Sequence, residues 1–175
     1  MREAKIPVML CVINILLVMG ANIATAENGL SGKWSLQDQK NTLTVVGTAV
    51  DEAESNMNLI IWLFNQSFIK NEARVCKVWR LLLKEKEFIW KCDDQKTQKI
   101  STIAKRLEST KEDGTKIEST FTFTANHISI IEKADFIERT NAWTKISDNQ
   151  MEYTYIMKSA NLPKPLMWTL VYKRQ

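Results

Sequence analysis

The stretch Lys116–Thr124 reads KIESTFTFT, and its side chains alternate between two kinds. One face takes Ile117, Ser119, Phe121 and Phe123. The other face takes lysine, glutamate and threonine. A period of two is what a β-strand with one buried and one solvated face requires. The preceding pair Asp113-Gly114 suits a tight hairpin turn, so this stretch predicts one strand of an antiparallel sheet.

Two stretches near the C-terminus repeat the alternation. In Gln150–Lys158, every second residue is bulky, namely Met151, Tyr153, Tyr155 and Met157. In Leu166–Arg174, the residues Trp168, Leu170 and Tyr172 share one face. The segment Asn161–Pro165 between them holds two prolines, which have no N–H for a strand ladder. This part of the chain therefore predicts two further strands joined by a loop.

Short β-prone runs separated by polar turns fill most of the remaining chain. They are Lys33–Gln37, Thr42–Val50, Val75–Leu83, Phe88–Cys92, Lys99–Ser109, Ile128–Glu132 and Phe136–Ile146. The segment Met57–Ile69 fits either a helix or a bulged strand, and both interpretations stay open. About eight to ten strands at hairpin spacing predict an all-β, mainly antiparallel fold. We expect an up-and-down meander barrel or a strongly curved sheet, with the one short helix, if it forms, near residues 57–69.

The composition fits one ordinary domain. The chain has 175 residues, 45% of them hydrophobic and 25% charged, with a net charge of +4. Basic residues are interleaved with acidic ones, as in Lys84–Glu87, and form no stripe. This pattern argues against a nucleic-acid partner.

The N-terminus has the three parts of a secretory signal peptide. The charged segment Met1–Lys5 precedes the largely apolar run Ile6–Met19, and Ala24–Ala26 is an A-x-A cleavage pattern. Residues 1–26 are therefore a predicted signal peptide and residues 27–175 a single domain, exported to the periplasm or secreted. An uncleaved anchor is the alternative that stays open, although the run is shorter than the ~20 residues of a spanning helix.

Two cysteines remain after signal cleavage, Cys76 and Cys92. An exported chain with one cysteine pair predicts one disulfide. The two β-prone runs around the charged turn predict a hairpin in which Cys76 faces Cys92 and Val78 faces Trp90. A catalytic dithiol needs closer spacing, as in C-x-x-C.

The sequence offers little for catalysis or metal binding. A nucleophile–histidine pair would have to use His127, the single histidine. There is no H-E-x-x-H, phosphate loop or calcium loop, and the acidic clusters at residues 51–54 and 93–94 fall in predicted turns. We therefore expect no catalytic residue, no metal ligand and no cofactor, so the chain is not expected to be an enzyme.

The two ends of the mature chain resemble the lipocalin-like (calycin) pattern. They carry Gly32-x-Trp34 and the terminal run Trp168–Arg174. The resemblance implies that Gly32 permits close backbone approach, that Trp34 plugs the barrel floor, and that Arg174 or Lys173 lies across the indole. The arrangement Cys76…Trp90-x-Cys92, followed by a threonine-rich hairpin, is also similar to a family of small exported proteobacterial proteins of unknown function.

Two functions fit these features. The first is a non-catalytic binding module whose barrel interior holds an apolar, lipid-like small molecule. Its candidate ligand-binding residues are Trp62, Phe121, Phe123, Trp143, Tyr153 and Tyr155. The alternative is a structural or protein-interaction domain of the periplasm or cell surface, in which the same aromatic side chains fill the core.

Overall fold

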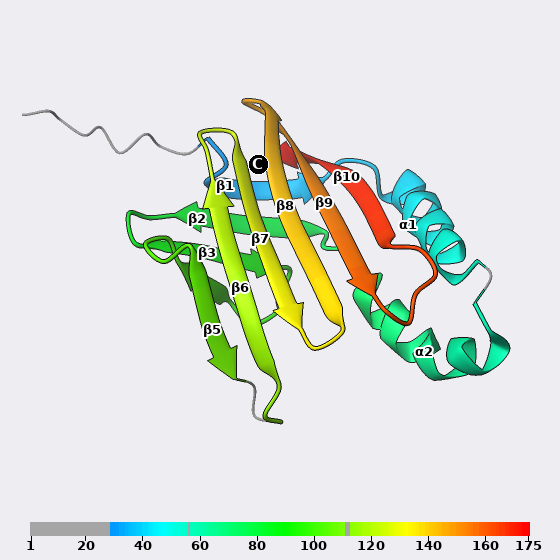
Figure 1. The fold of residues 1–175 in the computed structure, drawn as a ribbon. Helices are drawn as coiled ribbons and strands as arrows, with labels where there is room; N and C mark the ends of the chain where they lie inside the picture. Colours follow the sequence, from blue (N-terminus) through cyan, green and yellow to red (C-terminus); the bar gives the residue numbers. More distant parts are fainter. Residues whose placement is uncertain (1–28, 56, 111–112) are drawn as a thin grey trace, which may run out of the picture.

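A computed structural model describes residues 29–55, 57–110 and 113–175. The predicted signal peptide, residues 1–26, lies outside these residues. Ten antiparallel strands form one sheet curled into a half-barrel, and two helices are inserted between the first two strands (Figure 1). The predicted mainly antiparallel, strongly curved sheet is confirmed.

The strands follow one another around the sheet as a meander. Their bounds are β1 (Gly32–Leu36), β2 (Val78–Leu83), β3 (Glu87–Cys92), β4 (Gln98–Ser101), β5 (Arg106–Thr110), β6 (Lys116–Phe123), β7 (His127–Ala134), β8 (Ile137–Ser147), β9 (Gln150–Ser159) and β10 (Leu166–Arg174). Their order in space is β4-β3-β2-β1-β10-β9-β8-β7-β6-β5. Strand β1 therefore joins the β2–β4 hairpins to the long strands β6–β10.

Trp34 lies at the centre of β1 and is fully buried. It stands opposite Arg174 of β10 on one side and Trp79 of β2 on the other. The Arg174 guanidinium lies 4.5 Å from the centre of the Trp34 ring, and the indole Nε1 donates to the carbonyl of Leu30 at 2.8 Å. Arg174 also donates to the carbonyls of Gly29, Ser31 and Asp148. We call this group of residues the closed end.

The first helix, α1 (Gln39–Glu54), lies where the sequence predicts a strand over Thr42–Val50. That prediction is wrong, because the buried residues follow a helical period. They are Thr42, Val46, Ala49 and Ala53. Asp38 caps the helix by accepting a hydrogen bond from the amide of Asn41 at 3.0 Å. Burial along one helix face outweighs the β-propensity of the valines and threonines.

The segment Met57–Ile69, for which a helix and a bulged strand were both open, lies mostly in the second helix, α2 (Leu59–Glu72). It is tied to α1 by Trp62, whose Nε1 donates to a carboxylate oxygen of Glu54 at 2.7 Å. Both helices lie beside β9 and β10 (Figure 1). Neither of these described helices is long and apolar enough to cross a membrane.

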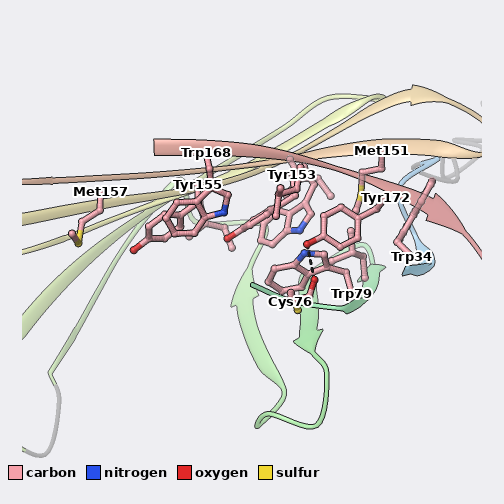
Figure 2. Close-up of a cluster of buried hydrophobic side chains, with 14 of the residues drawn as sticks. Trp34, Cys76, Trp79, Met151, Tyr153, Tyr155, Met157, Trp168 and Tyr172 are labelled. Atoms are coloured by element: carbon pink, nitrogen blue, oxygen red, sulfur yellow. Dashed lines mark hydrogen bonds between the residues drawn. The ribbon is translucent and has the colours of Figure 1, made fainter. Parts of the chain in front are cut away.

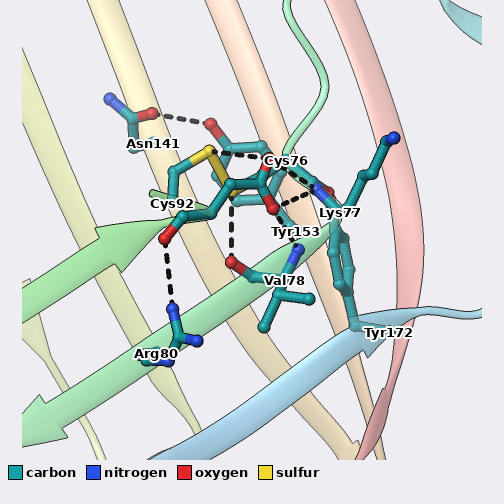
Figure 3. Close-up of a disulfide and its surroundings, with 9 residues drawn as sticks. Cys76, Lys77, Val78, Arg80, Cys92, Asn141, Tyr153 and Tyr172 are labelled. Atoms are coloured by element: carbon teal, nitrogen blue, oxygen red, sulfur yellow. Dashed lines mark hydrogen bonds between the residues drawn. A yellow bond between two sulfur atoms is a disulfide. The ribbon is translucent and has the colours of Figure 1, made fainter. Parts of the chain in front are cut away.

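A disulfide joins Cys76 to Cys92, but the hairpin register differs from the prediction. Cys92 stands opposite Trp79, and Trp90 stands opposite Leu81. The reason is that Cys76 precedes β2, in the link from α2. Asp93 holds this link by accepting from the amides of Lys77 (3.1 Å) and Val78 (2.8 Å) (Figure 3). We call Ala73–Lys77 the α2–β2 link.

The predicted single strand Lys99–Ser109 is also wrong, because it is split into β4 and β5. The chain turns away after Ser101, where Thr102 bonds back to the β2–β3 turn. Its hydroxyl donates to the carbonyl of Glu85 at 2.7 Å, and its amide donates to that of Lys86 at 3.0 Å. Strands β4 and β5 are the two edges of the sheet, so the half-barrel is open between them.

Two glycine substitutions should have opposite effects on stability. Gly32 has φ +143°, and a Cβ there would lie 3.3 Å from Nη1 of Arg174. Gly32→Ala should therefore lower the free energy of unfolding by about 1–3 kcal/mol. Gly47, inside α1, has nothing within 4 Å of a built Cβ, so Gly47→Ala should raise that free energy by about 0.5–1 kcal/mol. Urea denaturation of both variants checks this; equal effects would contradict the account of Gly32.

Removing the disulfide should destabilise the fold. The two cysteines are 16 residues apart, and a closed loop of about that length contributes roughly 3 kcal/mol in the chain-entropy model. Cys76→Ser with Cys92→Ser should lose about that much free energy of unfolding in urea. Dithiothreitol should have the same effect on the unaltered protein and none on the double variant. Alkylation of both cysteines without reductant would contradict the disulfide.

Candidate functional site

Aromatic side chains fill the concave face of the sheet next to the closed end (Figure 2). Trp143 is fully buried, and its ring centre lies 5.3 Å from that of Trp79, 5.5 Å from that of Tyr153 and 5.5 Å from that of Phe88. These four rings come from β2, β3, β8 and β9 and interlock by edge and tilted contacts. We call these four rings the aromatic floor.

A hollow of about 230 Å³ lies above this floor, and we call it the inner pocket. Its walls are the rings of Trp79, Trp90, Tyr153, Tyr155 and Trp168. Tyr155 and Trp168 face each other across β9 and β10, stacked with ring centres 4.5 Å apart (Figure 2). The strict alternation of both strands positions these rings, since it sends every second side chain inward. The hollow is smaller than the ~300 Å³ at which drug-sized pockets begin.

The end of α2 is fastened to the sheet beside the inner pocket by a polar contact. Glu72, the last residue of α2, accepts two hydrogen bonds from Arg139 of β8, at 2.7 and 2.9 Å. The Tyr155 hydroxyl donates to the same carboxylate. Both charged side chains are about four-fifths buried, so the bidentate ion pair is shielded from solvent. We call Glu72, Arg139 and Tyr155 the helix latch.

The surroundings of the latch fix its protonation. The hydrogen bonds that Arg139 donates to Glu72 raise the pKa of the Arg139 guanidinium. Burial, followed by the Glu72 carboxylate, raises the pKa of Tyr155 well above its usual range. Burial likewise raises the pKa of Tyr153. Arg139 therefore stays charged and both tyrosines stay neutral hydrogen-bond donors at physiological pH.

Polar side chains surround the mouth of the inner pocket. Arg74 belongs to the α2–β2 link, Gln95 and Lys96 to the β3–β4 turn, and Gln98 to β4. Arg74 lies 3.2 and 3.3 Å from the Gln95 side-chain oxygen when that amide is turned towards the guanidinium. We call these four residues the rim. Deeper inside, the Tyr153 hydroxyl donates to the Asn141 side-chain oxygen at 2.7 Å (Figure 3).

The structure places the candidates from the sequence in three settings. Tyr153 and Tyr155 line the inner pocket. Trp143 belongs to the aromatic floor, and Phe121 is buried beside it against Phe88. Trp62 lies on α2 and bonds Glu54, while Phe123 is half exposed, and neither lines the inner pocket. The candidate set is therefore spread over the pocket, the floor and the surface.

Several pocket residues are absent from the candidates based on sequence. Trp168 shares its alternation pattern with Tyr172, and that pattern was sufficient to place it on the inner face. Glu72 and Arg139 are 67 residues apart and carry no shared local pattern. The rim residues Arg74 and Lys96 lie in irregular segments, where no periodicity indicates direction.

One cluster of metal-ligand types exists among the described residues, at Cys76, Cys92 and Asp93. Both sulfurs are used in the disulfide, so neither is a thiolate able to bind a metal ion. The Asp93 carboxylate accepts backbone amides of the α2–β2 link. The cluster therefore has a structural role.

No protein-family model matches the chain, and no curated protein matches it in sequence. Solved structures with a similar fold include a Schistosoma mansoni fatty acid binding protein in complex with arachidonic acid, at 10% identity and a TM-score of 0.49, covering 86% of this chain and 98% of that one. Lipid binding protein 8 of Caenorhabditis elegans is 12% identical with a TM-score of 0.48, covering 84% and 96%. Zebrafish ileal bile acid-binding protein, complexed with cholic acid, is 12% identical with a TM-score of 0.43, covering 84% and 99%.

Similarities of this size give no information about a ligand of this chain. The curled antiparallel meander places Arg174 over the ring of Trp34, which is the contact that the resemblance of the chain's ends implies. The more specific families named from the sequence are not matched.

The helix latch should contribute more to the free energy of unfolding than an exposed ion pair does. Glu72→Gln leaves the buried Arg139 without its carboxylate, so the free energy of unfolding should fall by about 2 kcal/mol. The control is Glu138→Gln, which removes a carboxylate paired with the exposed Lys158 and Lys133 and should cost less than about 1 kcal/mol. Urea denaturation followed by tryptophan fluorescence measures both. A latch variant no less stable than the control would contradict this account.

Proposed function

We propose that this protein is a non-catalytic binding module that takes an apolar small molecule into the inner pocket. The observation that carries the proposal is the aromatic lining of that pocket. Five rings from four strands line one hollow, together with the polar side chains of the rim and of Asn71, Glu72 and Asn141. Pockets that bury small ligands share this combination of apolar walls with a few placed polar groups.

The position of α2 supports the same proposal. The helix end is held beside the pocket by the helix latch, and the α2–β2 link is held by the disulfide and Asp93. The pocket is therefore pre-formed on both sides. A pre-formed site loses less conformational entropy when it binds a ligand.

A structural or interaction domain with a filled core is the second candidate. The observation that favours it is the aromatic floor, which is packed as closely as a protein core. In this case the inner pocket would be a gap between packed side chains that binds no ligand. The two candidates make opposite predictions for ligand binding.

Export belongs to the proposal as well. It rests on the signal-like N-terminus and on the disulfide, which forms in oxidising compartments. The periplasm or the exterior of a bacterial cell is the location that we propose.

Binding of a neutral apolar probe tests the proposed function. The fluorescent probe 1-naphthylamine should bind the purified protein with saturation at one site. Gln98→Trp adds a bulky ring at the pocket rim and should weaken binding about tenfold or more, because the ring competes for the same space. Lys99→Trp is the matched control, since Lys99 is the next residue of β4 and does not line the pocket; its affinity should match the unaltered protein.

Native mass spectrometry of the purified protein adds a second measurement, because a co-purifying small molecule would support the binding module directly. Absence of probe binding together with a ligand-free mass would contradict the proposal and favour the filled-core domain.

A further inference from the structure

The rim of the inner pocket has an excess of positive charge. Glu72, the one acidic side chain in the lining, is already held by Arg139 and Tyr155. Arg74 faces a neutral amide, that of Gln95. Within the described residues, neither Arg74 nor Lys96 forms an ion pair. Two cations at the mouth of a hollow with aromatic walls attract a negatively charged group.

The lining of the same pocket also carries hydrogen-bond donors. Trp168 is 3% exposed and lines the pocket, and its indole Nε1–H has no hydrogen-bond partner among the described residues. The nearby Asn141 uses its oxygen for Tyr153, which leaves its amide NH₂ as a second donor. The interior therefore offers donors to an acceptor-bearing ligand.

The size of the pocket restricts the body of such a ligand. Its volume is about 230 Å³, and two of its lining rings belong to the aromatic floor, where Trp79 packs 4.9 Å from Tyr153 and 5.3 Å from Trp143 between ring centres. A long acyl chain would have to displace this floor. Tyr155 and Trp168 already stack on each other, and a planar ring gains from offset or edge contacts with aromatic walls of this kind.

From these three observations we infer that the ligand is a compact planar aromatic carboxylate, whose ring lies against the pocket walls and whose carboxylate meets the cations of the rim. The inference rests on the proposed function, which it narrows from apolar molecules in general to one class. The charge of the rim and the volume of the pocket point to this class of ligand. The aromatic walls alone would fit any apolar molecule.

Matched probes that differ in charge test the inference on the unaltered protein. We would compare 2-naphthoate with its neutral counterpart 2-naphthamide, and with laurate, by isothermal titration calorimetry. We expect 2-naphthoate to bind about ten- to a hundredfold more tightly than 2-naphthamide, because charge-assisted hydrogen bonds replace neutral ones. The advantage should shrink as salt is added, since the rim is exposed. Laurate should bind more weakly than 2-naphthoate.

Substitutions of rim residues test whether the preference for 2-naphthoate comes from the rim. Arg74→Gln and Lys96→Gln should each weaken 2-naphthoate about three- to tenfold and leave 2-naphthamide unchanged. Both side chains are exposed, so the fold should be retained. Lys40→Gln, on the exposed surface of α1, removes the same charge away from the pocket and should change neither affinity.

Each result separates this inference from the proposed function. If 2-naphthamide or 1-naphthylamine binds and 2-naphthoate has no advantage, the aromatic carboxylate is wrong and the apolar binding module stands. If laurate binds more tightly than 2-naphthoate, the compact ligand is wrong. If rim variants and the Lys40 control weaken 2-naphthoate equally, the effect comes from overall charge and the inference is overturned. If none of the probes binds, both proposals fail.

Discussion

The curl of the sheet depends on β1, a strand of five residues that pairs with β2 on one side and β10 on the other. Without it the ladder would divide into one unit of short hairpins and one of long strands. Trp34 in its centre is fully buried, and Arg174 ties it to the opposite end of the chain. A single buried ring with one cation thus brings together segments that are 140 residues apart in sequence.

The inner pocket forms where these two units meet. Its aromatic walls come from both: Trp79 and Trp90 from the hairpins, and Tyr153, Tyr155 and Trp168 from the long strands. The disulfide and Asp93 fix the α2–β2 link on the hairpin side, while the helix latch fixes α2 on the other. The link and the helix beside the pocket are therefore each held by a covalent or charge-assisted contact in the absence of a ligand.

Alternation along the chain was sufficient to predict the sheet and the inward face of β9 and β10, because a strand with one buried face must repeat every two residues. It failed for α1, whose short apolar side chains suit a strand or a helix equally well until tertiary burial selects the helix. The register of β2 and β3 was missed because Cys76 lies outside the strand. The Glu72–Arg139 contact joins distant segments, and no local pattern encodes such a pair.

The open side of the half-barrel leaves β4 and β5 with unpaired backbone groups, which are templates for association with other strands. Both strands are short, with four and five residues. Their exposed positions include Lys99, Arg106 and Glu108, and charges of this kind disfavour stacking of one edge on another. Side-chain charge thus protects the edges of this incomplete barrel in place of a closing hydrogen-bond ladder.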